Sequence, residues 1–185
     1  IRGAAQLLAS ELGDPAQQEY TDIIISEVDR LRTLVDRMLG PKEKLESELT
    51  NIHEVTERVR QLIEAEAKGS LAIERDYDPS LPDFYADAGQ LTQAILNLVR
   101  NAWQACGDSG LITLRTRVLR QFTVGGNRHK LVCALKVLDN GPGVSEILLT
   151  RLFLPMVTGN AKGTGLGLSI AQRIANQHGG LIQVR

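Results

Sequence analysis

Three polar or glycine-rich segments follow one another over about seventy residues, and each adjoins a strong helix or strand signal. They are Asn97 to Asn101, Asp139 to Gly143 and Gly163 to Leu168. A single glycine cluster constrains a chain little, because glycine serves any tight turn. The order and spacing of the three segments are more informative than any one of them, and they favour one shared site over three unrelated turns.

The first segment lies within an expected amphipathic helix from about residue 88 to residue 106. Apolar residues recur there at helical spacing, at Leu91, Ala94, Ile95, Leu98, Ala102 and Ala105. Asn97 and Asn101 are four residues apart and therefore lie on one face of that helix. Asparagine is a middling helix former, but its amide carbonyl is an oxygen ligand that suits magnesium. The two asparagines are either solvated side chains or ligands for a metal and its phosphates.

The second segment follows an apolar run, residues 131 to 138, which is typical of a strand buried on both faces. The run ends at Asp139, whose carboxylate can accept a hydrogen bond from an exocyclic amine. Gly141 and Gly143 would let the backbone approach a flat base closely. Taken alone, the segment from Asp139 to Gly143 is simply a turn.

The third segment precedes an expected helix at about residues 165 to 177. Glycines ahead of a helix let backbone N–H groups point at phosphates, where the helix dipole also favours negative charge. The segment is not a P-loop, because no Gly-Lys-Ser/Thr follows the glycines. Nor does a strand lead directly into it, as a dinucleotide-binding fingerprint requires. We expect residues 152 to 164 to form a lid over a nucleotide.

Together the three segments resemble the N, G1 and G2 boxes of sensor histidine kinases, which share an ATPase superfamily with gyrase, MutL and heat-shock chaperones. The segment from Phe153 to Thr158 is similar to the F box of that family, with Met156 where a second phenylalanine is usual. Residues 40–41, 75–82 and 152–158 resemble more specifically the nitrogen-regulation sensor kinases. The family resemblance extends over nearly the whole chain.

This resemblance implies a site for ATP and magnesium. Asn101 would coordinate the magnesium ion, Asn97 would contact the phosphates or the metal as the catalytic candidate, and Asp139 would read the adenine amine. The pocket and its lid would further include Gly141, Gly143, Gly163, Thr164, Gly165, Leu166 and Gly167. In the hydrolases of the superfamily a glutamate stands in the place of Asn97 as general base, whereas an amide has no useful basicity. Water is therefore not the expected nucleophile.

The first 40 residues favour a helical hairpin. Apolar residues step by three and four along two segments, at Ile1, Ala5, Leu8 and Leu12 and then at Ile24, Val28, Leu31, Val35 and Met38. The segment Gly13-Asp14-Pro15 would form the turn between the two helices. A hairpin with one apolar stripe cannot bury it alone. Two copies pairing into a four-helix bundle is the favoured solution, and packing against the chain's own second domain is the alternative.

The expected fold class is α+β, with the hairpin at residues 1–40 and an α/β sandwich that binds ATP at residues 41–185. The sandwich would carry helices on one face of a mixed sheet. Its further elements would be a strand near Leu49, a helix at 52–67, strands near 71–77, 111–119 and 131–138, and a last strand from Leu181. We expect the chain to begin just downstream of the family's phosphoacceptor histidine. We also expect it to end within the last strand, which would leave an open sheet edge.

None of the three histidines is expected to replace the phosphoacceptor. His53 lies in a mixed polar helix and His129 in a polar turn. His178 precedes Gly179 and Gly180, and a cation near a helix end followed by a glycine stop is ordinary capping. All three histidines therefore have structural or solvent interpretations.

Composition excludes some classes of function and partner. The net charge of −1, without a basic cluster or an aromatic platform, argues against a nucleic-acid surface. Cys106 and Cys133 have neither metal nor disulfide spacing, which favours reduced thiols in a cytoplasmic protein. No apolar run in the chain approaches the length of a membrane span.

The expected function is the core of a two-component sensor histidine kinase. It would bind Mg-ATP and pass the γ-phosphoryl to an upstream histidine and then to an aspartate of a response regulator, mainly by positioning and charge neutralisation. The resemblance also implies a homodimer, an NtrC-like receiver domain as partner and a PII-type signalling protein as a further partner. The alternatives are a non-catalytic module that binds nucleotide or docks a partner, and a hydrolase of the gyrase or MutL type. Asn97 weighs against the hydrolase, and nothing in the sequence excludes the module.

Overall fold

The computed structural model describes residues 23–25, 45–107, 110–154 and 165–184. The chain divides into two compact units, Ile1–Lys42 and Glu43–Arg185. Within the first unit the structure describes only residues 23–25, which are helical. The predicted hairpin and its turn therefore lie almost wholly outside the described residues and stay a prediction.

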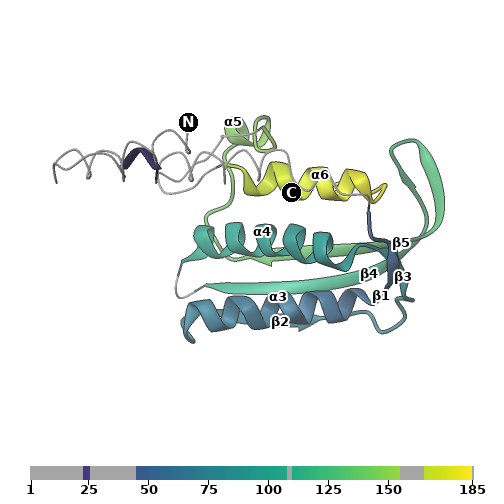
Figure 1. Cartoon of the computed structure of the whole chain (residues 1–185), viewed down its shortest axis with the longest axis horizontal. Helices are drawn as coiled ribbons and strands as arrows, with labels where there is room; N and C mark the ends of the chain where they lie inside the picture. Colours follow the sequence, from purple (N-terminus) through teal and green to yellow (C-terminus); the bar gives the residue numbers. More distant parts are fainter. Residues whose placement is uncertain (1–22, 26–44, 108–109, 155–164, 185) are drawn as a thin grey trace, which may run out of the picture. The chain divides into compact units, whose positions relative to one another are not determined.

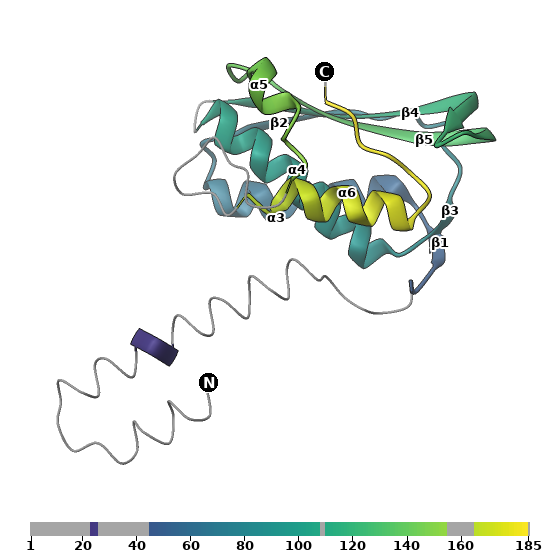
Figure 2. The same ribbon diagram turned by 90° about the horizontal axis from the view of Figure 1, so that it is seen from above.

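The second unit is an α/β sandwich. Its elements in chain order are β1 (Glu48–Thr50), α3 (Ile52–Ala67), β2 (Ala72–Asp76), β3 (Phe84–Ala86), α4 (Ala88–Cys106), β4 (Leu111–Val124), β5 (Asn127–Asp139), α5 (Glu146–Leu149) and α6 (Gly167–Gln177). A three-stranded sheet has the order β2-β4-β5, with β2 parallel and β5 antiparallel to β4, and β1 pairs with β3 in a separate antiparallel ribbon. Helices α3, α4 and α6 lie on one face of the larger sheet, and α4 is the middle one (Figure 1, Figure 2). The predicted fold class of this unit is confirmed.

Helices α3 and α4 have the bounds that the sequence predicts, because each carries a complete set of local signals. The side chain of Asn51 accepts a hydrogen bond of 2.9 Å from the N–H of His53, and Asp87 does the same for Gln90 at 2.9 Å. An oxygen at the N-cap satisfies an N–H group that has no partner inside the helix. At the other end α3 stops at Lys68, which has left-handed backbone angles, and α4 stops at Gly107.

The core lies between these two helices and the central strand. Val59 and Ile63 of α3, Val99 of α4, and Ile112 and Leu114 of β4 have no exposed surface. Full burial of such a side chain contributes ~1.5–3 kcal/mol relative to exposure. This packing fixes α4 on the sheet, and α4 carries the asparagine pair.

The β4–β5 hairpin is longer than the sequence predicts. Its turn is Gly125-Gly126, with φ of +55° and +87°, and Val124 pairs with Asn127 across it. Two successive positive φ values suit a two-residue hairpin turn, and glycine adopts them without strain. The predicted strands end at 119 and begin again at 131, because most residues between them are polar. Those residues continue the ladder and are exposed except for the buried Val124, so His129 lies in a strand opposite Phe122 rather than in a turn.

Three further differences concern short segments. The predicted strand from Leu181 is wrong, since residues 181–184 have no regular structure and pair with no strand that the structure describes. Among the described strands, β5 is an edge strand of the larger sheet, because it pairs with β4 on one side and with no strand on the other. The elements β3 and α5 are not predicted by the sequence, because both are too short to show a periodic pattern. No helix within the described ranges is long and apolar enough to cross a membrane.

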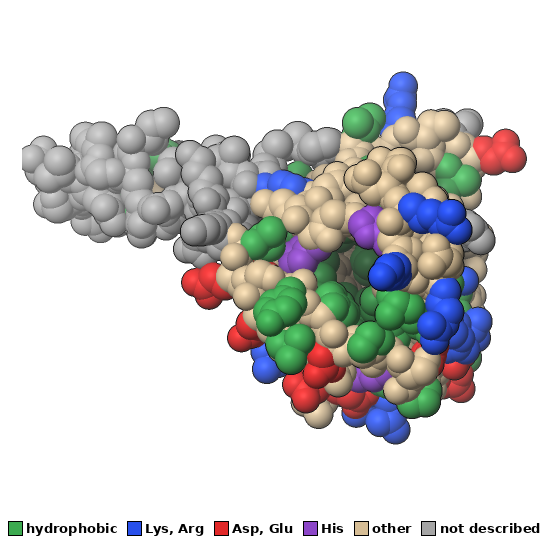
Figure 3. All heavy atoms as spheres, turned by 90° about the vertical axis from the view of Figure 1, so that its right-hand side faces the viewer, with side chains coloured by type: hydrophobic (Ala, Val, Ile, Leu, Met, Phe, Trp, Pro, Cys, Tyr) green, Lys and Arg blue, Asp and Glu red, His purple; other side chains and the backbone are tan. Residues whose placement is uncertain are grey.

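The β1–β3 ribbon leaves two large side chains in solvent. Leu49 and Tyr85 are directly paired across the ribbon and are 63% and 76% exposed. Figure 3 faces the end of the unit that carries this ribbon and shows hydrophobic and histidine side chains gathered there.

Candidate functional site

The asparagine pair lies where α4 meets the first residue of α6. A Cβ atom at position 167 would lie 3.6 Å from Nδ2 and 3.7 Å from Oδ1 of Asn101, and 3.7 Å from Cβ of Asn97. The side chains of Asn97 and Asn101 therefore border the N-terminus of a helix. The structure thus brings together two of the three segments that the sequence singles out.

The amide of Asn97 has an unused donor at this place. Its Nδ2 atom is shielded from solvent and has no hydrogen-bond partner among the described residues. A buried polar atom without a partner costs ~1–3 kcal/mol, so a ligand atom that accepted from this donor would remove that cost. An anionic oxygen beside the start of α6 would satisfy this donor, because the first N–H groups of a helix also favour negative charge.

The second segment packs on the C-terminal end of the same helix. The N–H of Gly141 donates to Oδ1 of Asp139 at 2.9 Å, and the N–H of Leu111 donates to Oδ1 of Asn140 at 3.0 Å. A Cβ atom at position 141 would lie 2.8 Å from Oδ1 of Asp139 and 3.0 Å and 3.1 Å from the carbonyl carbon and oxygen of Ala105. Only glycine fits this approach without a shift.

All three segments therefore lie along one helix. Ala105, beside Gly141, is one helical turn beyond Asn101. The exposed carboxylate of Asp139 thus stands near one end of α4, and the start of α6 stands near its middle. An elongated ligand with a hydrogen-bonding base at one end and phosphates at the other matches this arrangement.

The remaining predicted pocket residues fall into three groups. Gly143 and Gly165 have φ of +77° and +65°, which glycine adopts freely. Leu166 is 1% exposed, so its side chain anchors the start of α6 and leaves only its backbone for a ligand. Gly163 and Thr164 lie outside the described residues, as do residues 155–162 of the predicted lid. The roles assigned to all of these residues stay predictions.

The two cysteines are free, and neither has the properties of a reactive thiol. Burial raises the pKa of Cys133 to about 11. Burial also raises the pKa of Cys106, with a smaller contribution from the negative charge of Asp139. A thiol reacts as its thiolate, so both shifts make these side chains less reactive near neutral pH.

Two features near the site were missed in the sequence. Asn140 holds the turn after β5 to the start of β4, and the only signal for it is a polar residue directly after a strand end. His178 hydrogen bonds with the start of α4 as well as with its own helix, which no local pattern indicates. His53, in contrast, stacks on Tyr77 with ring centroids 4.9 Å apart and hydrogen bonds with Thr116, a structural role that agrees with its interpretation from sequence.

Residues 86–185 match the family described as histidine kinase-, DNA gyrase B-, and HSP90-like ATPase. The chain belongs to this ATPase family. It is 51% identical over 186 residues to the sensory histidine kinase/phosphatase NtrB of Vibrio alginolyticus, across 100% of this chain and 53% of that protein. It is 39% identical over 191 residues to NtrB of Rhizobium meliloti, across 99% of this chain and 50% of the relative. The chain spans about half the length of the curated relatives it matches.

Solved structures agree with these relatives. Histidine kinase ThkA in complex with the response regulator protein TrrA is 27% identical, with a TM-score of 0.66 over 99% of this chain and 52% of that one. Full-length ShkA in complex with AMPPNP is 26% identical, with a TM-score of 0.62 over 95% of this chain and 37% of that one. The predicted resemblance to sensor histidine kinases is confirmed.

Proposed function

We propose that this chain is the ATP-binding core of a two-component sensor histidine kinase in nitrogen regulation. The observation that carries the proposal is the meeting of Asn97, Asn101 and Gly167 beside the start of α6. An amide stands at position 97, where the hydrolases of the superfamily carry a glutamate. Because an amide cannot take a proton from water, Asn97 does not activate water, and the similarity to histidine kinases assigns the phosphoryl group to a histidine.

Each residue has a distinct task in this proposal. Asn97 donates through Nδ2 to a phosphate oxygen, while Asp139 accepts from the adenine amine. Asn101 offers its amide oxygen to magnesium, which takes few protein ligands and completes its shell with water and phosphate oxygens. Magnesium, when bound, neutralises phosphate charge. The Nδ2 donor of Asn97 supports a phosphate oxygen beside it, and the amide oxygen of Asn101 at the start of α6 is a ligand of the kind that magnesium takes.

The partners follow from the same proposal. ThkA, which is similar in structure, was solved with a response regulator protein. We infer an NtrC-like receiver domain as the final phosphoryl acceptor of this protein and a PII-type protein as a regulator. Residues 1–40 would pair with a second copy into a four-helix bundle, giving a cytoplasmic homodimer.

Calorimetric titration of the chain with ATP tests the nucleotide site. We expect binding that depends on magnesium, and weaker magnesium-dependent binding for Asn101→Ala in a folded variant. Asn127→Ala is the matched control, because Asn127 is exposed at the distal hairpin. We also expect ATP to bind about ten- to a hundredfold more tightly than GTP, since a carboxylate facing the guanine carbonyl is left without a partner.

Two results would contradict this assignment. Equal affinity for ATP and GTP would remove Asp139 from base recognition, and unchanged magnesium dependence in Asn101→Ala would remove Asn101 from the metal site. Labelled ATP given to the full-length protein and its receiver domain then separates a kinase from a non-catalytic module, because only a kinase labels a histidine. A hydrolase would instead release inorganic phosphate steadily.

A further inference from the structure

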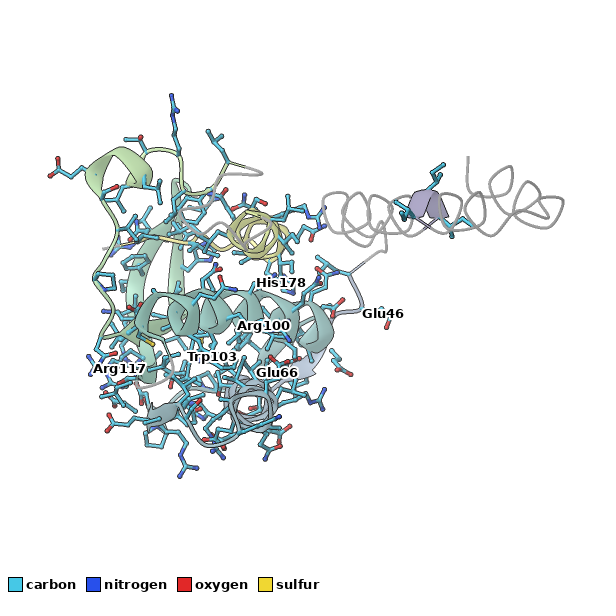
Figure 4. All side chains as sticks on the ribbon, turned by 90° about the vertical axis from the view of Figure 1, so that its left-hand side faces the viewer. Glu46, Glu66, Arg100, Trp103, Arg117 and His178 are labelled. Atoms are coloured by element: carbon cyan, nitrogen blue, oxygen red, sulfur yellow. The ribbon has the colours of Figure 1, made fainter. Side chains whose placement is uncertain are left out.

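His178 connects the end of α6 to the beginning of α4. Its Nδ1 atom lies 2.8 Å from the carbonyl oxygen of Ile174, and its Nε2 atom lies 3.1 Å from the backbone nitrogen of Asp87. Ile174 belongs to α6. Asp87 is the N-cap of α4 and precedes His178 by 91 residues in the chain. Figure 4 labels His178 on the side of α6 that faces α4.

The two partners define the state of the ring. A carbonyl oxygen can only accept a hydrogen bond, so Nδ1 carries the proton. The N–H of Asp87 can only donate, so Nε2 offers its lone pair. With this tautomer His178 caps its own helix, as the sequence suggests, and also reaches α4, which the sequence does not indicate. The backbone itself closes the helix, since the N–H groups of Gly179 and Gly180 donate to the carbonyls of Asn176 at 3.0 Å and Ala175 at 2.8 Å.

Helix termination therefore does not require the histidine, and its distal nitrogen serves a contact between two helices. That contact, with the one at Gly167, fixes α6 at both ends of its length. The first residue of α6 adjoins Asn97 and Asn101, and its C-cap meets Asp87. The two helices consequently run antiparallel. The eleven residue steps from Gly167 to His178 span ~16 Å along a helix, close to the ~15 Å of the ten steps from Asp87 to Asn97.

We propose that His178 is a positioning residue that sets the register of α6 along α4, and so the place of the first N–H groups of α6 relative to the asparagine pair. The inference rests on the proposed nucleotide site, because it assigns those N–H groups to phosphate. A helix is stiff along its axis, so a displacement at its C-cap is transmitted to its N-terminus. The adenine end of the site is held by β5 and the C-terminal end of α4, which α6 does not position.

The same junction carries the segment that enters the second unit. Oδ2 of Asp87 accepts from the N–H of Glu46 at 3.3 Å, while Oδ1 accepts from the N–H of Gln90 at 2.9 Å. One residue therefore joins the entering segment, the start of α4 and, through His178, the end of α6.

Asparagine and glutamine at position 178 separate the two hydrogen bonds of the histidine ring, because each amide side chain can replace one of the two ring nitrogens. His178→Asn keeps a donor near the position of Nδ1 but is too short to reach Asp87. His178→Gln places an acceptor near the position of Nε2. His129→Asn on the exposed hairpin is the control. The affinities of the chain for Mg-ATP and for adenosine are measured by calorimetry, and thermal unfolding confirms that each variant is folded.

We expect His178→Asn to bind Mg-ATP roughly three- to tenfold more weakly, as the loss of one interhelix hydrogen bond predicts, with adenosine affinity unchanged. His178→Gln should lie within about twofold of the wild type for both ligands. A residue that only stabilised the fold would not separate the two ligands. If His178→Asn does not fold, His178→Ser removes the same contact with a smaller side chain.

The positioning role is refuted if His178→Asn binds ATP like the wild type, if ATP and adenosine weaken equally, or if glutamine fails to restore ATP binding. If the wild-type chain binds ATP and His178→Asn binds it with the same affinity, this inference is refuted and the proposed function is not. A wild-type chain that binds neither ligand refutes the proposed function and the inference together.

Discussion

Adding one methyl group at Gly141 tests whether the turn after β5 must lie directly on the end of α4. In Gly141→Ala the new Cβ atom would lie 2.8 Å from Oδ1 of Asp139 and 3.0 Å from the carbonyl carbon of Ala105. The first contact is relieved by rotation of the Asp139 side chain, whereas the second involves backbone and requires a shift of a few tenths of an ångström. Both adjustments displace the carboxylate of Asp139 from its present position.

The structure gives two magnitudes for this variant. Overpacking of a well-packed site costs ~1–3 kcal/mol of stability. If Asp139 accepts a hydrogen bond from adenine, the loss of that charged bond costs ~1.5–3 kcal/mol of binding, or about ten- to a hundredfold in ATP affinity. Chemical denaturation measures the first quantity, and calorimetry on the folded variant measures the second.

Gly126→Ala is the matched control for Gly141→Ala. It also adds a methyl group to a glycine, but it lies in the β4–β5 turn with no atom within 4 Å of the new carbon. Its φ of +87° should cost some stability without any effect on ATP binding. If Gly141→Ala binds ATP as tightly as this control, the close approach at Ala105 has no part in base recognition.

Two further predictions concern the part of the unit away from the nucleotide site. Thr116→Val should lower the free energy of unfolding by ~1–3 kcal/mol, because the fully buried hydroxyl of Thr116 accepts from the N–H of Asp78 at 3.0 Å and hydrogen bonds with His53 at 3.0 Å. Urea denaturation measures the change, and a loss no larger than that of the exposed Thr123→Val would contradict the reasoning. Hydrogen bonds from the Ser80 hydroxyl and from the N–H groups of Val118 and Ser80 lower the pKa of Asp78 from 3.8 to about 2. Since the charged form is favoured in the folded state, the stabilisation is present above pH 3.8 and is lost as the pH falls toward about 2. The difference in free energy of unfolding between the wild type and Asp78→Asn should therefore become smaller as the pH falls over that range. A difference that stays constant across an acid titration would refute the assignment.

The sequence predicts best where several local signals coincide. The bounds of α3 and α4 follow from an N-cap residue, a 3.6-residue apolar stripe and a definite stop, all of which are local in the chain. The asparagine pair follows from the same periodicity, because its spacing puts both side chains on one face whatever the tertiary structure does.

Prediction fails where pairing between distant segments decides the structure. Residues 120–130 are mostly polar and resemble a loop, yet the turn at Gly125-Gly126 and the ladder hydrogen bonds extend both strands through them. Leu181 begins a segment with the composition of a strand, but a strand also needs a partner edge. His178 looks like an ordinary cap because its partner, Asp87, is 91 residues away. In each case the deciding interaction has no signature in the neighbouring sequence.

One helix serves as the common reference for every part of the proposed site. Asp87 at its start meets His178, Asn97 and Asn101 near its middle meet Gly167, and Ala105 near its end meets Gly141. A helix rises ~1.5 Å per residue, so the stretch from residue 97 to residue 105 fixes ~12 Å between the proposed phosphate and adenine contacts. Burial of Val99 between these contacts holds that stretch on the sheet. The separation of the two ends of the proposed site is thus set by rigid backbone, whereas the position of α6 depends on its buried apolar face and on the hydrogen bond between His178 and Asp87. The same Asp87 accepts a hydrogen bond from the N–H of Glu46, so the segment before β1 adjoins the junction between α4 and α6.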